Sequence, residues 1–190
     1  FHEIWVGAYP RATLKEKGVG WLQQKTILSF VNKCKPAWVT SSNAAAIDRL
    51  KHAGVPAKFL YLFGNISYSA TSEVAATEQI LKVAFFGTPY AEFPYDKIDS
   101  FFSALSKTSG KKLEIILIGR QREDTGTHRV LSLCKKNKFL IKRTGELSTN
   151  LISEQLQKCT LGVSTTPYDV IGKSGATAAM LEHGLPVLAY

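Results

Sequence analysis

From residue 81 onward, short apolar runs alternate with longer stretches whose apolar side chains recur every three or four residues. Residues 113–118 are a clear case of the first kind, because every residue except Glu114 is apolar, which is typical of a buried strand. Residues 95–107 are of the second kind and predict a helix. Strands that alternate with helices form a mainly parallel sheet with helices on both faces. The sequence therefore predicts an α/β fold with a Rossmann-like, doubly wound parallel sheet.

This alternation also sets the predicted domain boundaries. We expect a Rossmann-like domain, truncated at its C-terminus, at residues 81–190, and an incomplete second α/β domain at 1–63. A linker at 64–80, which begins with a stretch rich in Gly, Asn and Ser, joins them. The expected strands are residues 37–40, 58–63, 83–86, 113–118, 139–141, 161–163 and 185–189. The expected helices are residues 21–34, 44–53, 95–107, 127–136, 149–158 and 175–183.

The chain has a net charge of +9, and its basic residues are spread along the sequence with one local concentration. We interpret this concentration as a solvated helix end and strand edge, so no nucleic-acid partner is expected. A basic surface that binds RNA or anionic lipid stays open as an alternative. The cluster consists of Lys135, Lys136, Lys138, Lys142 and Arg143.

Cysteine usage and hydropathy favour a cytoplasmic protein. The three cysteines, Cys34, Cys134 and Cys159, show no short spacing, which gives little support to a disulfide framework or a zinc site. No apolar run approaches the roughly 20 residues that cross a bilayer, and the sequence does not open on a signal peptide. We expect a cytoplasmic location, with peripheral contact to an anionic inner membrane face as an open alternative.

The residues after the predicted strands are the candidates for a binding site, because ligands of open parallel sheets bind beyond the carboxyl ends of the strands. The most informative stretch precedes the last helix, where Ser174, Gly175, Ala176 and Thr177 surround its first N–H groups with small side chains. Lys173 adds a positive charge, and together these features suit a diphosphate. An alternative, in which Ser174 only caps the helix, fits these residues equally well.

Residues 175–189 (GATAAMLEHGLPVLA) resemble the EAMA-x-G-x-PV segment of retaining, group 1 glycosyltransferases of the GT-B type. The glycine turns at Gly87 and Gly119 and the turn at 142–148 resemble the same family in the expected order. Residues 2–3, 39–43 and 62–65 resemble the family's acceptor domain and the crossing into the second domain, so the similarity spans nearly the whole chain. It implies that residues 81–190 are the nucleotide-sugar-binding domain and that residues 1–63 are the end of the acceptor domain.

The resemblance also implies which residues contact the substrate. The donor would be a nucleotide-diphosphate sugar (UDP-, GDP- or ADP-linked), with no separate cofactor and no metal. His2 would approach the donor sugar as a catalytic residue, and Gly145, Glu146 and Leu147 would lie beside the nucleotide base and ribose. The diphosphate would be bound by Gly87, Thr88, Arg120, Lys173, Ser174, Gly175, Ala176 and Thr177.

The activity that the resemblance implies is transfer of a hexose-like sugar, with retention, to an unknown acceptor such as a glycan, a lipid or a small molecule. The chain departs from the family at three positions. Two glutamates eight positions apart are common in the family, and here Ile171 and Ala179 take their places. Thr88 stands where an arginine is usual. Because neither Ile nor Ala can hydrogen-bond a sugar, a non-catalytic nucleotide-binding module is the alternative.

Overall fold

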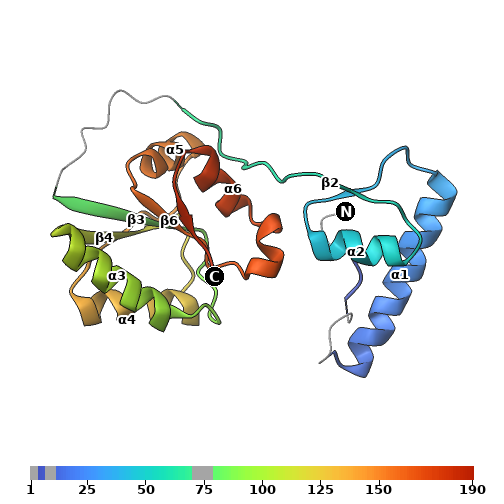
Figure 1. Cartoon of the computed structure of the whole chain (residues 1–190), viewed down its shortest axis with the longest axis horizontal. Helices are drawn as coiled ribbons and strands as arrows, with labels where there is room; N and C mark the ends of the chain where they lie inside the picture. Colours follow the sequence, from blue (N-terminus) through green and yellow to red (C-terminus); the bar gives the residue numbers. More distant parts are fainter. Residues whose placement is uncertain (1–3, 7–11, 70–78) are drawn as a thin grey trace. The chain divides into compact units, whose positions relative to one another are not determined.

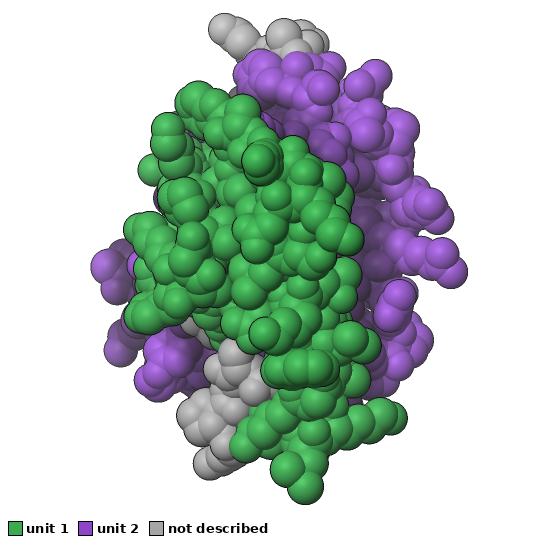
Figure 2. All heavy atoms as spheres, turned by 90° about the vertical axis from the view of Figure 1, so that its right-hand side faces the viewer, with its two compact units in different colours: residues 1–62 green, residues 63–190 purple. Residues whose placement is uncertain are grey.

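A computed structural model describes residues 4–6, 12–69 and 79–190. The chain forms two compact units, Phe1–Leu62 and Phe63–Tyr190, which are coloured separately in Figure 2. Each unit has a hydrophobic core of its own. All the predicted site residues except His2 belong to the second unit, so this unit positions the candidate site.

Unit 2 is built on a five-stranded sheet in which all neighbouring strands are parallel (Figure 1). The strands are β3 Ile80–Phe86, β4 Lys112–Ile118, β5 Leu140–Arg143, β6 Leu161–Val163 and β7 Val187–Leu188. Their order in the sheet is β5-β4-β3-β6-β7. The chain therefore starts in the middle of the sheet, winds to one edge, and then crosses back to the other. This order confirms the predicted doubly wound α/β sheet.

Four helices cover the two faces of the sheet. They are α3 Tyr95–Ser109, α4 Thr125–Asn137, α5 Thr149–Gln157 and α6 Gly175–Glu182. α3 and α4 lie on one face, and α5 and α6 lie on the other (Figure 1). The side chains of successive strand residues point to opposite faces of the sheet. Val83 and Ile115 therefore pack in the core with α3 and α4. Ala84 and Ile116 pack in the core with α5 and α6. Burial of both faces explains the continuous apolar runs of these strands.

Three features of unit 2 differ from the predicted elements. A short 3₁₀ helix, η1 Tyr168–Lys173, lies between β6 and α6, where no element was expected. β3 begins at Ile80 rather than at residue 83, because its ladder with β4 continues to the pair Ile80 and Lys112. β7 is shorter than the predicted strand at 185–189. The remaining strands and helices lie close to their predicted bounds.

Unit 1 contains two helices, α1 Leu14–Cys34 and α2 Ala44–His52. Its two short strands, β1 Thr40–Ser41 and β2 Lys58–Phe59, pair in parallel. α1 begins well before the predicted residue 21 at a capping box, in which the Thr13 side chain accepts from the backbone of Glu16 and the Glu16 carboxylate accepts from the backbone of Thr13. Among the described residues, no helix is both long and apolar enough to cross a membrane. The buried core of this unit consists of Trp5, Val39, Ala46, Ile47, Leu50, Val55 and Ala57.

The segment predicted as a linker, 64–80, begins on the surface of unit 2. The backbone N–H of Gly64 donates to Oε1 of Glu182 on α6, at 2.9 Å. The side chain of Ile66 is 5% exposed and packs in the core shared by α5 and α6. The last residue of the segment, Ile80, already belongs to β3. The described parts of this segment are therefore part of unit 2.

Candidate functional site

Three glycine turns meet at the carboxyl edge of the sheet. Gly87 follows β3 with a φ of 85°, and its N–H donates to the carbonyl oxygen of Ile118 at 3.1 Å. Gly119 follows β4 with a φ of 96° and forms an antiparallel bridge with Gly145, which follows β5. Such positive φ values favour glycine, because a side chain would be strained there. The predicted turns after β3, β4 and β5 therefore form one continuous rim.

The Gln121 side chain hydrogen-bonds to the turns that follow β3 and β4. The sequence analysis did not single out this residue. Its side-chain Nε2 lies 3.3–3.4 Å from the carbonyl oxygens of Gly87, Ile118 and Gly119 and donates to them. Its Oε1 is buried and has no hydrogen-bond partner within the described part of the chain. The available signal was a polar side chain just beyond the end of a strongly apolar strand, at the edge where ligands of parallel sheets bind.

A network of hydroxyl groups fixes the start of α6. Ser174 caps the helix, because its Oγ accepts from the N–H of Thr177 at 3.2 Å. The Thr177 hydroxyl lies 2.8 Å from the Ser174 Oγ and 2.7 Å from the Oγ of Ser164, which directly follows β6. Thr166 donates to the same Ser174 oxygen at 3.2 Å. The first turn of α6 is thereby held against the carboxyl end of β6, at the same edge as the glycine turns.

The start of α6 also lies close to the turn after β3. A Cβ atom placed on Gly87 would be 3.8 Å from the Cβ of Ala176. In the same region the N–H of Tyr90 donates to the Oγ1 of Thr165 at 3.0 Å, which joins the loop after β3 to the loop after β6. The structure therefore brings Gly87, Gly145 and the first residues of α6 to one edge of one sheet.

The charged and polar candidates are placed around this rim. Thr88, Arg120 and Glu146 are exposed, whereas Lys173 is half-buried at the end of η1. Leu147 packs against the core shared by α5 and α6. His2 lies outside the described residues. Among the described residues, no group of three or more His, Cys, Asp or Glu side chains could hold a metal ion.

The two positions that lack the family's glutamates have different surroundings. Ile171 is half-buried in η1. Ala179 is fully buried in α6, and a Cβ atom placed on Gly64 would lie only 2.7 Å from its Cα. The backbone of Gly64 thus covers this part of α6, so the position of Ala179 has no exposed surface.

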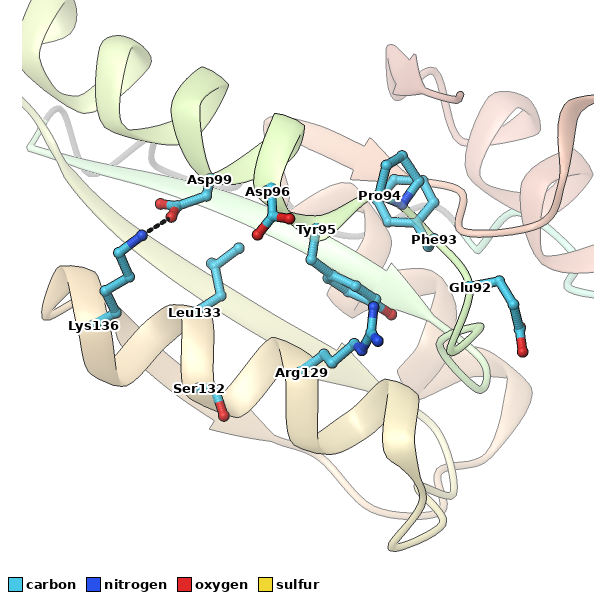
Figure 3. Close-up of a pocket in the computed structure, with 10 residues that line it drawn as sticks. All are labelled: Glu92, Phe93, Pro94, Tyr95, Asp96, Asp99, Arg129, Ser132, Leu133 and Lys136. Atoms are coloured by element: carbon cyan, nitrogen blue, oxygen red, sulfur yellow. Dashed lines mark hydrogen bonds and ion pairs between the residues drawn. The ribbon is translucent and has the colours of Figure 1, made fainter.

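A separate cavity of about 460 Å³ lies between α3 and α4, and it contains none of the predicted site residues (Figure 3). The Lys136 Nζ donates to the Asp99 carboxylate at 2.6 Å, and this hydrogen bond lowers the pKa of Asp99. Burial raises the pKa of the Tyr95 hydroxyl, which donates to the Tyr90 carbonyl oxygen at 2.8 Å. The Arg129 guanidinium lies 5.9 Å from the centre of the Tyr95 ring. This cavity combines the Lys136 and Asp99 ion pair with a buried tyrosine.

The basic cluster predicted at 135–143 is partly neutralised. Lys136 pairs with Asp99, and the Arg143 guanidinium donates to the Glu123 carboxylate at 2.6 Å. The Lys142 Nζ donates to the side-chain oxygen of Gln155 at 3.4 Å. Two of its cations are thus matched by carboxylates, which reduces the positive potential that this cluster could offer an anionic polymer.

The fold of the whole chain is similar to that of a solved structure. A mutant of S. aureus TarM, crystallised in complex with fondaparinux, alpha-GlcNAc-glycerol and UDP, matches it with a TM-score of 0.58 at 15% sequence identity. The match covers 100% of this chain but 36% of the TarM chain, so the chain spans about a third of TarM. The likeness shows a shared fold. No protein-family profile matches the sequence, and no curated protein matches it.

Proposed function

We propose that the carboxyl edge of the unit 2 sheet binds a nucleotide-diphosphate sugar and that the chain belongs to a glycosyltransferase. The observation that carries this proposal is the meeting of Gly87, the bridged pair Gly119 and Gly145, and the first turn of α6 at one edge. Glycine turns allow close approach of a ligand to the backbone, and a helix N-terminus presents N–H groups to an anion. Both features suit a diphosphate.

In this scheme the chemistry is the stabilisation of a leaving group. The diphosphate would accept hydrogen bonds from the N–H groups of Gly175 and Ala176, and Lys173 and Arg120 would supply positive charge as the bond to the sugar breaks. Gly145, Glu146 and Leu147 would contact the base and ribose. The sugar would pass with retention to an unknown acceptor, as in hexosyltransferases of group 1, and this scheme requires no metal.

The shared fold supports this proposal. The TarM structure that shares this fold holds UDP, alpha-GlcNAc-glycerol and fondaparinux. A nucleotide-sugar donor and a glycan acceptor are therefore the first substrates to test. The base, the sugar and the acceptor are then decided by experiment.

The first test is a thermal-shift screen against UDP, GDP, ADP and their sugars. A ligand at 100 times its Kd stabilises the folded protein by about 2.7 kcal/mol, which raises the melting temperature by several degrees. We expect one nucleotide diphosphate to give such a shift. Lys173→Ala should remove most of it, whereas Lys135→Ala, an exposed lysine near the end of α4, should leave it unchanged. Equal losses in the two variants would contradict the assigned site.

The second candidate is a nucleotide-binding module without transferase activity. It is favoured by Ile171 and Ala179, which cannot act as carboxylates, and by the complete burial of Ala179. Hydrolysis of the bound sugar nucleotide separates the two functions, because a transferase commonly releases sugar to water slowly in the absence of an acceptor. Binding without any hydrolysis or transfer, measured on the full-length protein, would favour the module.

A further inference from the structure

Strand β5, Leu140–Arg143, is the outermost strand on one side of the unit 2 sheet. It pairs with β4 on its inner side, and among the described residues no strand pairs with its outer side. All four residues of β5 are exposed, whereas most residues of β4 are buried. An edge strand of this kind presents backbone groups that can pair with another extended chain.

The hydrogen-bond register shows which backbone groups of β5 point outward. The N–H of Thr144, the residue after the strand, donates to the carbonyl oxygen of Leu117 on β4 at 3.0 Å. In a parallel pair a strand uses alternate residues to bond one neighbour, so every second residue before Thr144 also faces β4. The N–H and C=O groups of Ile141 and Arg143 consequently point away from β4. These two residues present donors and acceptors at the spacing that a further strand would match.

Two exposed apolar side chains form the middle of this edge, and lysines flank them. Leu140 is 46% exposed and Ile141 is 39% exposed. Lys138 precedes the strand and Lys142 follows the apolar pair, and both lysines are exposed. Because strand side chains alternate between the two faces of a sheet, Lys142 lies on the same face as Leu140. There its Nζ donates to the side-chain oxygen of Gln155 on α5.

The charge along this edge is positive. Residues 135–143 include the basic cluster described above and contain no Asp or Glu. Lys136 and Arg143 pair with carboxylates of other segments. Among the described residues, Lys138 and Lys142 form no ion pair. A second copy of the chain on this edge would place the same cations against each other, which is unfavourable, so the edge is complementary to an acidic partner.

We propose that the outer edge of β5 binds an extended acidic segment of a partner protein, which adds to the sheet as a further strand. The backbone of this segment would pair with the outward N–H and C=O groups of Ile141 and Arg143. Its apolar side chains would cover Leu140 and Ile141, and its acidic side chains would lie beside Lys138 and Lys142. None of these residues belongs to the candidate nucleotide site, so this inference does not depend on the proposed function.

The probe for this edge is a capped peptide of sequence Glu-Glu-Val-Val-Glu-Glu. In an extended peptide each face then carries one valine between two glutamates, which matches an apolar pair flanked by lysines. The sequence reads the same in both directions, so the peptide can add as a parallel or an antiparallel strand. The control peptide Lys-Lys-Val-Val-Lys-Lys keeps the valines and reverses the charge.

Binding to the full chain is measured by the fluorescence anisotropy of each labelled peptide. We expect the acidic peptide to bind, with an affinity that falls as salt is added, and the basic peptide not to bind. Lys142→Glu should weaken binding of the acidic peptide about tenfold. Lys51→Glu makes the same charge change at an exposed position of α2 in unit 1 and should weaken it less than about twofold. Absence of binding by the acidic peptide, equal binding of the two peptides, or equal losses in the two variants would overturn the proposal.

Amide hydrogen exchange tests the docking mode on the unmodified chain, even if Lys142→Glu fails to fold. In the free chain the N–H of Ile141 should exchange much faster than that of Lys142, which faces β4. Saturating acidic peptide should slow exchange at Ile141 and Arg143, and unchanged exchange there would overturn the proposal. An Ile141 amide that is already protected in the free chain would also overturn it, because the edge would then be covered. Protection that appears only as the protein concentration rises would assign the edge to a second copy of the chain instead.

Discussion

At the scale of single residues, close backbone contacts limit what this fold accepts. Gly126, in the first turn of α4, is buried against the loop after β3, and a Cβ atom there would overlap the carbonyl oxygen of Pro89 and lie 2.7 Å from its carbonyl carbon. These atoms are backbone and cannot rotate away. We expect Gly126→Ala to lower the free energy of unfolding of unit 2 by about 2 kcal/mol.

Urea unfolding followed by a probe in unit 2 measures this loss. Thr125→Ala is the matched control, because the neighbouring side chain is exposed and its removal should change the stability by less than about 0.5 kcal/mol. Similar effects of the two variants would show that the loop at Pro89 moves to make room for the added methyl group on α4. The same loop is joined to the loop after β6 by the hydrogen bond between Tyr90 and Thr165, so this contact also supports the candidate site.

At the scale of the elements, α3 and α4 are joined by an ion pair with a defined pH response. Asp99 accepts from Lys136 Nζ at 2.6 Å and from Asn137 Nδ2 at 2.7 Å. The Lys136 hydrogen bond lowers the pKa of Asp99 below its ordinary value of 3.8. Because the folded-state pKa is lower than the unfolded-state value, the pair stabilises the protein above about pH 4, and this contribution is lost as the pH falls through the lower folded-state pKa.

We expect the carboxyl ¹³C titration midpoint of Asp99 to rise when Lys136 is changed to Met. Lys135→Met removes an equal charge from the neighbouring position and should move the midpoint much less, since the Asp99 contact is made by Lys136. In thermal melts, the difference between the parent chain and Lys136→Met should shrink from pH 7 to pH 3. A difference that is constant across this range would assign the effect to packing of the lysine stem.

The elements that the sequence predicted best are those whose apolar pattern directly reflects burial, on both faces of a strand or on one face of a helix. β4 and α3 lie close to their predicted bounds, because apolar runs and helical spacing mark them directly. η1 was missed, since a short 3₁₀ helix has no periodicity of its own. α1 was started too late although its capping box, Thr13 with Glu16, is visible in the sequence.

The candidate site was predictable only in part, because only some of its features have a local signal in the sequence. Glycine turns after strands and the cap of α6 are local signals, so Gly87, Gly145 and Ser174 could be named in advance. The role of Gln121 depends on carbonyl groups of β4 and of the turn after β3. The burial of Ala179 depends on Gly64, far away in the sequence. Such contacts exist only once the sheet and its helices are assembled. Ligand contacts of the named residues stay predictions.

At the scale of the whole molecule, the two units have separate cores, and the glycine turns and α6 all belong to unit 2. A fragment of residues 63–190 should therefore fold alone and keep the nucleotide response of the full chain. This response should be measured by the thermal-shift screen on both proteins. Loss of the response in a folded fragment would mean that unit 1 contributes to nucleotide binding.

The boundary between the units can be tested with a second fragment. Residues 79–190 keep every strand and helix of the sheet domain but lack residues 64–69, and so lose the buried Ile66 and the contacts of Gly64 and Ser69. Burial of one isoleucine side chain contributes about 1.5–3 kcal/mol, and each lost hydrogen bond about 1 kcal/mol. The shorter fragment should therefore unfold at clearly lower urea concentration than residues 63–190. Equal midpoints would instead make residues 64–69 the linker that composition alone suggested, because their contacts with α5 and α6 would then contribute nothing to the stability of the sheet domain.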